Sequence, residues 1–194
     1  MNEAPSLRPL YLNGQIVGEV PITGNPELDV ATAERFLVER GLFRETRRIA
    51  AMLVQAYSFG KNAQHIYERY LSGPLANPLG MAPFVVNGSF ALEIYVKALS
   101  EIHGVRPRGH NLQELYGALN PQIHVLLEEL TRGYIKAKSL RDIPDFKTCI
   151  YSIGNAFEKW RYHYENGTAP LIQPLDMFLS LDVLHAACVR RSRA

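Results

Sequence analysis

The chain has 194 residues, of which 47% are hydrophobic and 21% are charged, and its formal net charge is +2. This length and composition allow one domain with a sizeable core, together with a small appendage. We expect no membrane span, which needs ~18 or more consecutive apolar residues. The first residues also lack the basic-then-apolar pattern of a signal peptide. The sequence therefore predicts a cytoplasmic protein without membrane contact.

The charge is unevenly distributed along the chain. Residues 1–43 carry three basic side chains against six acidic ones, whereas the remainder carries eighteen against thirteen. This excess is too small for non-specific binding along a phosphate backbone, so charge alone leaves nucleic-acid contact open. The arginines gather in two clusters, Arg44/Arg47/Arg48 and Arg190/Arg191/Arg193.

The N-terminal segment has the pattern of a small ββα unit. Residues 10–20 hold two short apolar runs around an Asn-Gly pair at 13–14, which favours a two-residue hairpin turn. Asp29 is the predicted N-cap of a helix over residues 30–41. A unit of this size, residues 1–43, is too small to fold alone, so we expect it to pack on the rest of the chain.

Residues 44–194 are predicted to form a helical bundle, because their apolar residues recur with the helical period of 3.6. The predicted fold class is therefore all-α, with the N-terminal hairpin and helix as an addition. A Pro- and Gly-rich loop is expected over residues 72–83. The other expected helices cover residues 45–71 (bent or split at Gly60), 111–119, 123–134, 145–164 (capped by Asp145) and 175–188.

The segment Ser89–His103 is apolar on almost every side, which predicts the central helix of the bundle. Glu93 and Lys97 lie four residues apart and share its one polar stripe. Charges on a buried helix must be paired or must face a cleft. This helix is therefore both the expected core and a candidate site.

Three sequence features together resemble the HEPN domain family, a helical bundle found in prokaryotic toxins, defence proteins and nucleotidyltransferase partners. They are the run ALEIYVKAL at 91–99, the helix start His110-Asn111-Leu112, and the Arg161-Tyr162 pair on a later helix. The resemblance covers about residues 45–190 in element order. Its motifs are confined to two segments, 91–116 and 155–166.

Many members of that family are metal-independent ribonucleases with an arginine, four to six intervening residues and a histidine on a late helix. Such spacing places a cation and an acid/base on one surface. The resemblance identifies Arg161 as the arginine, but Asn166 stands where the histidine is expected. This favours a non-catalytic module. The alternative is a divergent ribonuclease that uses Arg161 and His163, with the two residues contributed across a dimer.

The resemblance implies a homodimer that binds RNA, a nucleotide or a protein partner, within a toxin–antitoxin or defence system. Two interpretations of the cations stay open, namely anion binding and structural ion pairs of Arg161 with Glu93 or Glu165 and of Lys97 with Glu93. His110 either fixes its loop or binds a ligand. The candidate ligand-binding residues are Glu93, Lys97, His110, Arg161, Tyr162 and Asn166.

The sequence predicts no metal and no cofactor. No set of His, Cys, Asp and Glu residues has metal-ligand spacing, and no Gly-rich phosphate loop follows a strand. Cys149 and Cys188 occupy apolar positions of predicted helices, so we expect two buried, reduced thiols.

Overall fold

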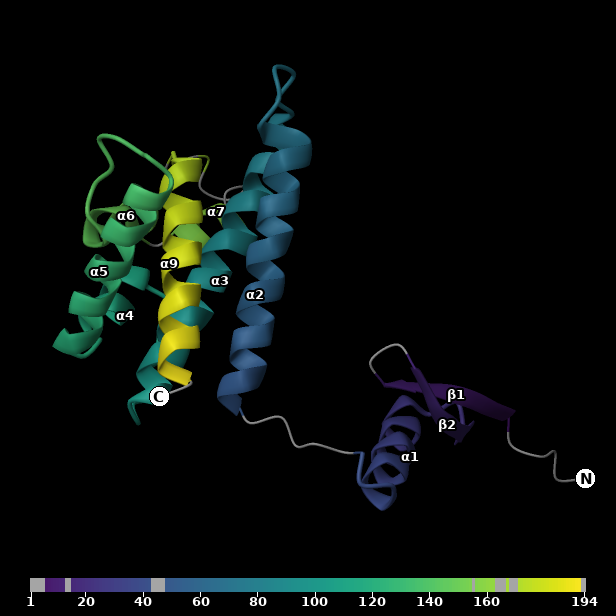
Figure 1. Ribbon diagram of the computed structural model, residues 1–194. Helices are drawn as coiled ribbons and strands as arrows, with labels where there is room; N and C mark the ends of the chain where they lie inside the picture. The colour runs from purple at the N-terminus through teal and green to yellow at the C-terminus, as the bar shows by residue number, and fades with distance from the viewer. Residues whose placement is uncertain are drawn as a thin grey trace, which may run out of the picture. The chain divides into compact units, whose positions relative to one another are not determined.

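The computed structural model describes residues 6–12, 15–42, 48–154, 156–162, 167 and 171–192 (Figure 1). It is 69% helix and 9% strand, which confirms the predicted mainly helical fold with a small sheet. The chain divides into two compact units, Met1–Thr46 and Arg47–Ala194. The predicted boundary after residue 43 lies close to this division.

The first unit contains the predicted hairpin. Strand β1, Ser6–Leu12, pairs antiparallel with β2, Gln15–Ile22, and the register shifts between Leu10 and Tyr11. The predicted Asn-Gly turn at 13–14 lies outside the described residues. Helix α1, Pro26–Glu39, contacts β2.

The predicted N-cap of this helix is wrong. Asn25 caps it, because its side-chain oxygen accepts hydrogen bonds from the amides of Glu27 at 3.0 Å and Leu28 at 3.4 Å. Pro26 follows at the first helical position, where its missing N–H costs nothing. Asp29 instead accepts bonds from the Thr23 amide and hydroxyl at 2.7 and 2.8 Å. These bonds fix the preceding loop and lower the pKa of the Asp29 carboxyl.

The second unit begins with α2, Arg48–Ile66, which passes into a π-helical turn over Tyr67–Leu71. The helix is continuous at Gly60, so the expected bend or split is wrong. A Cβ at Gly60 would lie 3.4 Å from a Leu181 side-chain carbon and 3.8 Å from Ala91. The glycine therefore lets neighbouring helices pack close to α2.

Helix α3, Met81–Ile102, starts eight residues before the predicted Ser89 and follows a short 3-10 turn, Pro78–Gly80. The loop expected over 72–83 is correspondingly shorter. Pro83 belongs to the first turn of α3, where backbone N–H groups have no acceptor within the helix. A proline there does not end the helix.

Helix α3 is the centre of the second unit and contacts α2, α4 (Leu112–Gly117), α7 (Ala156–Arg161) and α9 (Pro174–Ser192) (Figure 1). Its residues Leu92, Val96 and Leu99 are fully buried, as predicted. With its preceding turn, the segment Pro78–Ile102 is long and apolar enough to cross a membrane by length and composition alone. However, 61% of its most apolar window is buried inside the protein, which fits the core helix of a soluble bundle.

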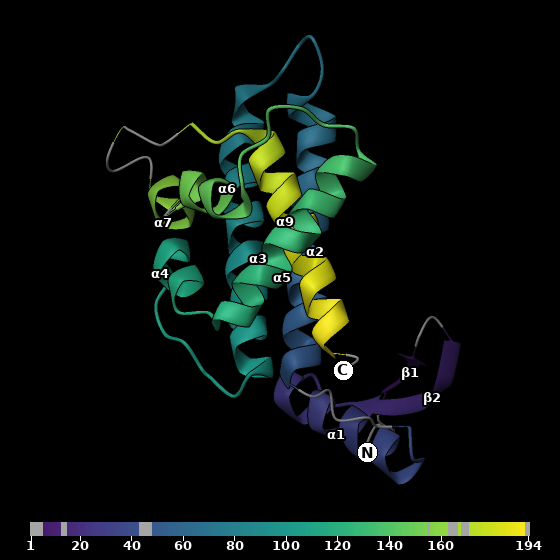
Figure 2. The same cartoon turned by 60° about the vertical axis from the view of Figure 1, so that its left-hand side comes forward.

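The remaining helices pack against α3 or against α9, as seen from a second direction in Figure 2. They are α4 (Leu112–Gly117), α5 (Pro121–Ala137), α6 (Phe146–Ile153), α7 (Ala156–Arg161) and α9 (Pro174–Ser192).

The helix expected over 145–164 is interrupted, and this correction affects the candidate site. Asp145 caps α6 as predicted, accepting a bond from the Thr148 amide at 2.7 Å. The chain then leaves the helical conformation at Gly154, whose φ is +50°. A residue with a side chain adopts such a φ only with strain. Arg161 therefore belongs to a separate short helix, α7, which contacts α3.

Candidate functional site

The candidate site is built around Glu93, a carboxylate in the middle of α3 with only 2% of its surface exposed. Its Oε1 accepts hydrogen bonds from Lys97 Nζ at 2.7 Å and lies 2.9 Å from His110 Nδ1. Among the described residues, nothing bonds its buried Oε2. A buried carboxylate oxygen without a hydrogen bond destabilises the folded state. The carboxylate at this position is therefore not explained by stability alone.

His110 reaches Glu93 from the loop between α3 and α4. Gly109 precedes it with a φ of +89°, and Asn111 follows it as the N-cap of α4, accepting a bond from the Gln113 amide at 2.9 Å. The cap fixes the chain directly after the histidine. Leu112, buried at 1% exposure, anchors the start of α4 in the core.

The contact with Glu93 determines how the His110 ring is presented. An ionised carboxylate only accepts hydrogen bonds, so Nδ1 carries the proton that it donates to Glu93. Nε2 is then the nitrogen available to other groups, and 56% of the side chain is exposed. A carboxylate that orients a histidine in this way leaves an acid/base or hydrogen-bonding group facing outward.

Arg161 lies at the end of α7 on an aromatic surface. Its guanidinium carbon is 5.1 Å from the centroid of the Phe157 ring and 4.5 Å from that of Tyr162, and Nη2 donates to the Tyr162 hydroxyl. Both geometries are favourable cation–π contacts. They hold an exposed cation in a defined place without neutralising it.

Phe157 connects the arginine with the buried carboxylate. Its ring stacks on Phe90 of α3 at 5.2 Å and lies 6.3 Å from the ring of His110. Arg161 therefore contacts one side of a ring that also neighbours the histidine. Sequence reasoning did not single out Phe157 or this connecting position.

The structure thus joins Glu93, Lys97 and His110 by direct contacts, and the Phe157 ring lies between His110 and Arg161. The suggested ion pair of Arg161 with Glu93 does not form in the part of the chain that the structure describes, whereas the pair of Lys97 with Glu93 does. The candidates His163 and Asn166, and the suggested partner Glu165, lie outside the described residues. The roles of all these residues remain predictions.

Sequence reasoning missed a second polar cluster, on the opposite edge of α3. The Tyr95 hydroxyl lies 2.9 Å from His185 Nδ1 of α9, and the ring of Tyr57 lies 5.5 Å from the His185 ring. Burial raises the pKa of the Tyr95 hydroxyl, so the hydroxyl stays protonated and can donate. These residues line a cavity of about 230 Å³ together with Lys61 and Asp182. Only the spacing of Asp182 and His185, one helical turn apart, signals the cluster in the sequence.

Within the described ranges, no three side chains of the His, Cys, Asp and Glu types lie close enough to hold a metal ion. Comparison of the chain with known protein families, with curated proteins and with solved structures finds no match.

Proposed function

We propose that the second unit is a non-catalytic, HEPN-like module that binds RNA or a nucleotide through its phosphate groups. The observation that carries the proposal is the exposed Arg161 guanidinium, held on Phe157 and Tyr162, with the Phe157 ring also 6.3 Å from the ring of His110. A guanidinium with free donor edges binds phosphate in two-point geometry. A neighbouring aromatic side chain offers a stacking surface for a base.

The charges near the site favour contact with a single phosphate group over contact with several phosphates along a nucleic-acid backbone. Lys97 is only 21% exposed and is neutralised by Glu93, so it contributes little net positive potential. Arg161 then supplies the principal charge, and His110 can donate a hydrogen bond from Nε2 to a phosphate oxygen only when its ring carries both protons. We therefore expect modest affinity, on the order of the micromolar range or weaker at physiological salt.

The alternative is a divergent metal-independent ribonuclease with toxin-like activity. The orientation of His110 by Glu93 favours it, because this pair resembles a general acid/base with its supporting carboxylate. In that case Arg161 would stabilise the developing phosphorane charge, with His110 or His163 moving the proton. We prefer the binding module, since Asn166 occupies the position of the family's histidine.

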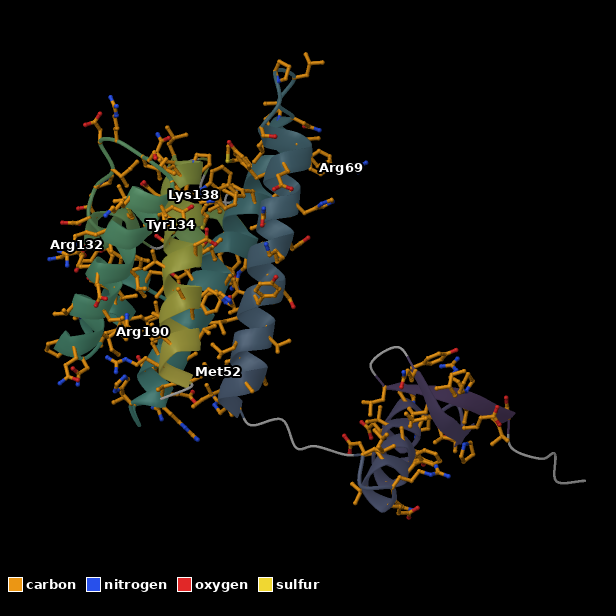
Figure 3. The ribbon with its side chains drawn as sticks, viewed as in Figure 1. Met52, Arg69, Arg132, Tyr134, Lys138 and Arg190 are labelled. Carbon is orange, nitrogen blue, oxygen red and sulfur yellow. The ribbon has the colours of Figure 1, made fainter. Side chains whose placement is uncertain are left out.

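Fluorescence anisotropy with a labelled single-stranded RNA tests the binding proposal. We expect Arg161→Ala to weaken binding at least fivefold. The slope of the logarithm of the binding constant against the logarithm of the salt concentration should fall by about 1, the change expected for one lost phosphate contact. Arg132→Ala removes an exposed arginine of α5, labelled in Figure 3, and should leave binding unchanged. Equal affinities of the two variants would refute the proposal.

Incubation of total RNA with purified protein and a chelator separates the two functions. The module leaves the RNA intact. The ribonuclease would be established instead by cleavage that survives stringent purification and disappears in two single variants. One is Arg161→Ala, and the other is either His110→Ala or His163→Ala. A role in a toxin–antitoxin or defence system, in the cytoplasm, belongs to the same proposal and is tested by growth after induced expression.

A further inference from the structure

A larger cavity, of about 680 Å³, lies at one end of the helical unit, where α2 begins and α3 and α9 end (Figure 1). Three arginines from different parts of the chain line it, namely Arg48, Arg106 and Arg191, and Glu101 is the one carboxylate among the described residues of the lining. Its volume is in the range of small-molecule sites. None of these residues belongs to the site around Glu93.

Glu101 organises two of the arginines. Only 8% of its side chain is exposed, and its two oxygens lie 3.1 and 2.9 Å from Arg48 Nε. Arg106 Nε lies 4.0 Å from the same carboxylate. In both arginines Nε is the nitrogen nearest Glu101, so the terminal guanidinium nitrogens can donate to another acceptor. Both side chains are also largely exposed.

Arg191 provides an independent indication of a ligand. Its Nε is buried and has no hydrogen-bond acceptor among the described residues. A buried cationic donor without an acceptor costs free energy that an anion placed against it would recover. Arg191 also lies in the last turn of α9, where a cation complements the helix dipole.

The charge balance of the cavity is positive. Three arginines against Glu101 leave two positive charges on the side chains that line it. The ends of α3 and α9 together offset roughly one charge, at about −0.5 each. A positive balance remains, in a cavity whose guanidinium groups fit phosphate oxygens in two-point geometry.

The rest of the lining is aliphatic. Ile49, Ala50, Leu53 and Ile102 form the apolar part of the wall. Such a surface suits the organic portion of a ligand and not a free inorganic ion. Phosphomonoesters combine a charge of about −1.5 to −2 at pH 7 with an organic group.

We propose that this cavity binds a small phosphomonoester of nucleotide size, with its phosphate held by Arg191 and Arg106 and its organic part against Ile49 and Leu53. The site is distinct from the proposed phosphate contact at Arg161. It adds a small-molecule ligand to the protein and does not depend on the RNA-binding proposal.

Isothermal titration calorimetry with adenosine 5′-monophosphate as the probe tests the site, with inorganic phosphate and adenosine as comparison ligands. We expect the monophosphate to bind most tightly, phosphate more weakly and adenosine not measurably. Arg191→Gln should weaken binding of the monophosphate at least tenfold and Arg106→Gln at least threefold. Because 78% of the Arg106 side chain is exposed, its replacement leaves the fold intact and keeps the test valid if Arg191→Gln is unstable.

Arg69→Gln is the matched control, since Arg69 is exposed and lies at the other end of α2 from Met52, as Figure 3 shows. It should bind the monophosphate like the parent. The proposal is overturned if the monophosphate does not bind at millimolar concentration, or if adenosine binds equally well. It is also overturned if Arg161→Ala abolishes binding while Arg106→Gln does not, because the probe would then occupy the other site.

Discussion

His110 and Glu93 are 17 residues apart in the chain, yet His110 Nδ1 lies 2.9 Å from the same Glu93 oxygen that Lys97 reaches at 2.7 Å. One carboxylate oxygen therefore holds an intrahelical partner and a loop partner together. Lys97 compensates the buried charge, whereas His110 ties the α3–α4 loop to the core helix. The two contacts are separable by mutation.

The ion pair of Lys97 with Glu93 should behave as a buried pair. Lys97→Met leaves the Glu93 carboxylate with one partner in the core, and we expect a loss of about 3 kcal/mol in the free energy of unfolding. The double variant Glu93→Leu/Lys97→Met removes both charges and should recover most of that loss, because an apolar pair of similar volume is often neutral. Urea unfolding at pH 7 measures both.

The control for this cycle is Lys136→Met, which removes an exposed lysine of α5. It should change stability by less than about 0.5 kcal/mol. If Lys97→Met is as mild as Lys136→Met, the carboxylate is solvated and the site is open to water at Glu93.

The packing of α3 gives a second prediction. Leu99 is fully buried, so Leu99→Ala should lower the free energy of unfolding by about 2–5 kcal/mol through lost burial and a residual cavity. Val125 of α5 is 67% exposed, and Val125→Ala should cost less than about 1 kcal/mol. Similar losses in the two variants, measured by urea unfolding, would contradict the central position of α3.

Local patterns predicted the parts of this structure that depend on neighbours in the chain. The apolar period identified the buried Leu92, Val96 and Leu99, and the spacing of four residues identified the pair of Glu93 with Lys97. The Asp145 cap also follows from residue type and position. Each of these features depends on residues that lie within about one helical turn of one another.

Features that depend on packing between helices could not be predicted in the same way. Tyr95 and His185 are 90 residues apart, and no periodicity indicates that they meet. The same holds for Phe157 between Phe90 and His110. Gly154 lies within an otherwise regular helical pattern, and only its positive φ reveals the break that sets the position of α7.

The α6 cap gives a pH-dependent prediction. Hydrogen bonds from the Thr148 amide lower the pKa of the Asp145 carboxyl below its ordinary value of 3.8. The folded state therefore gains stability above that value and loses it as the pH falls through the lowered pKa. At pH 7 we expect Asp145→Ala to cost about 1 kcal/mol, the usual contribution of an N-cap.

Urea unfolding of the parent and the Asp145→Ala variant at pH 7 and pH 3 checks this, and the difference between them should shrink at pH 3. Asp145→Asn is the matched control, because asparagine caps a helix without titrating. It should retain most of the stability at pH 7. A cost for Asp145→Ala that is the same at both pH values would show that the charged carboxylate is not the capping group.

Assembly gives a further prediction. The proposed resemblance to HEPN bundles, which pair through the helices that carry their arginine motif, predicts a homodimer through the end of α7, where Arg161 and the following Tyr162 are exposed. Light scattering at tens of micromolar should give twice the chain mass of 21.9 kDa. A double Arg161→Ala/Tyr162→Ala variant should shift the protein toward the monomer. A monomeric parent at that concentration would rule out a pairing of this kind.

The two cysteines should be chemically inert in the folded protein. Burial raises the pKa of the Cys149 thiol and of the Cys188 thiol to about 12 each, so both are protonated at pH 8, and protonated thiols are poor nucleophiles. We expect no reaction with a disulfide reagent at pH 8 in the native state and two reacting thiols per chain in denaturant. The variant Ser72→Cys, at an exposed position after the π-helical turn, should add one fast-reacting thiol without denaturant. Fast native reaction of the parent would mean that α6 or α9 opens readily and that the core around α3 is less stable than its burial indicates.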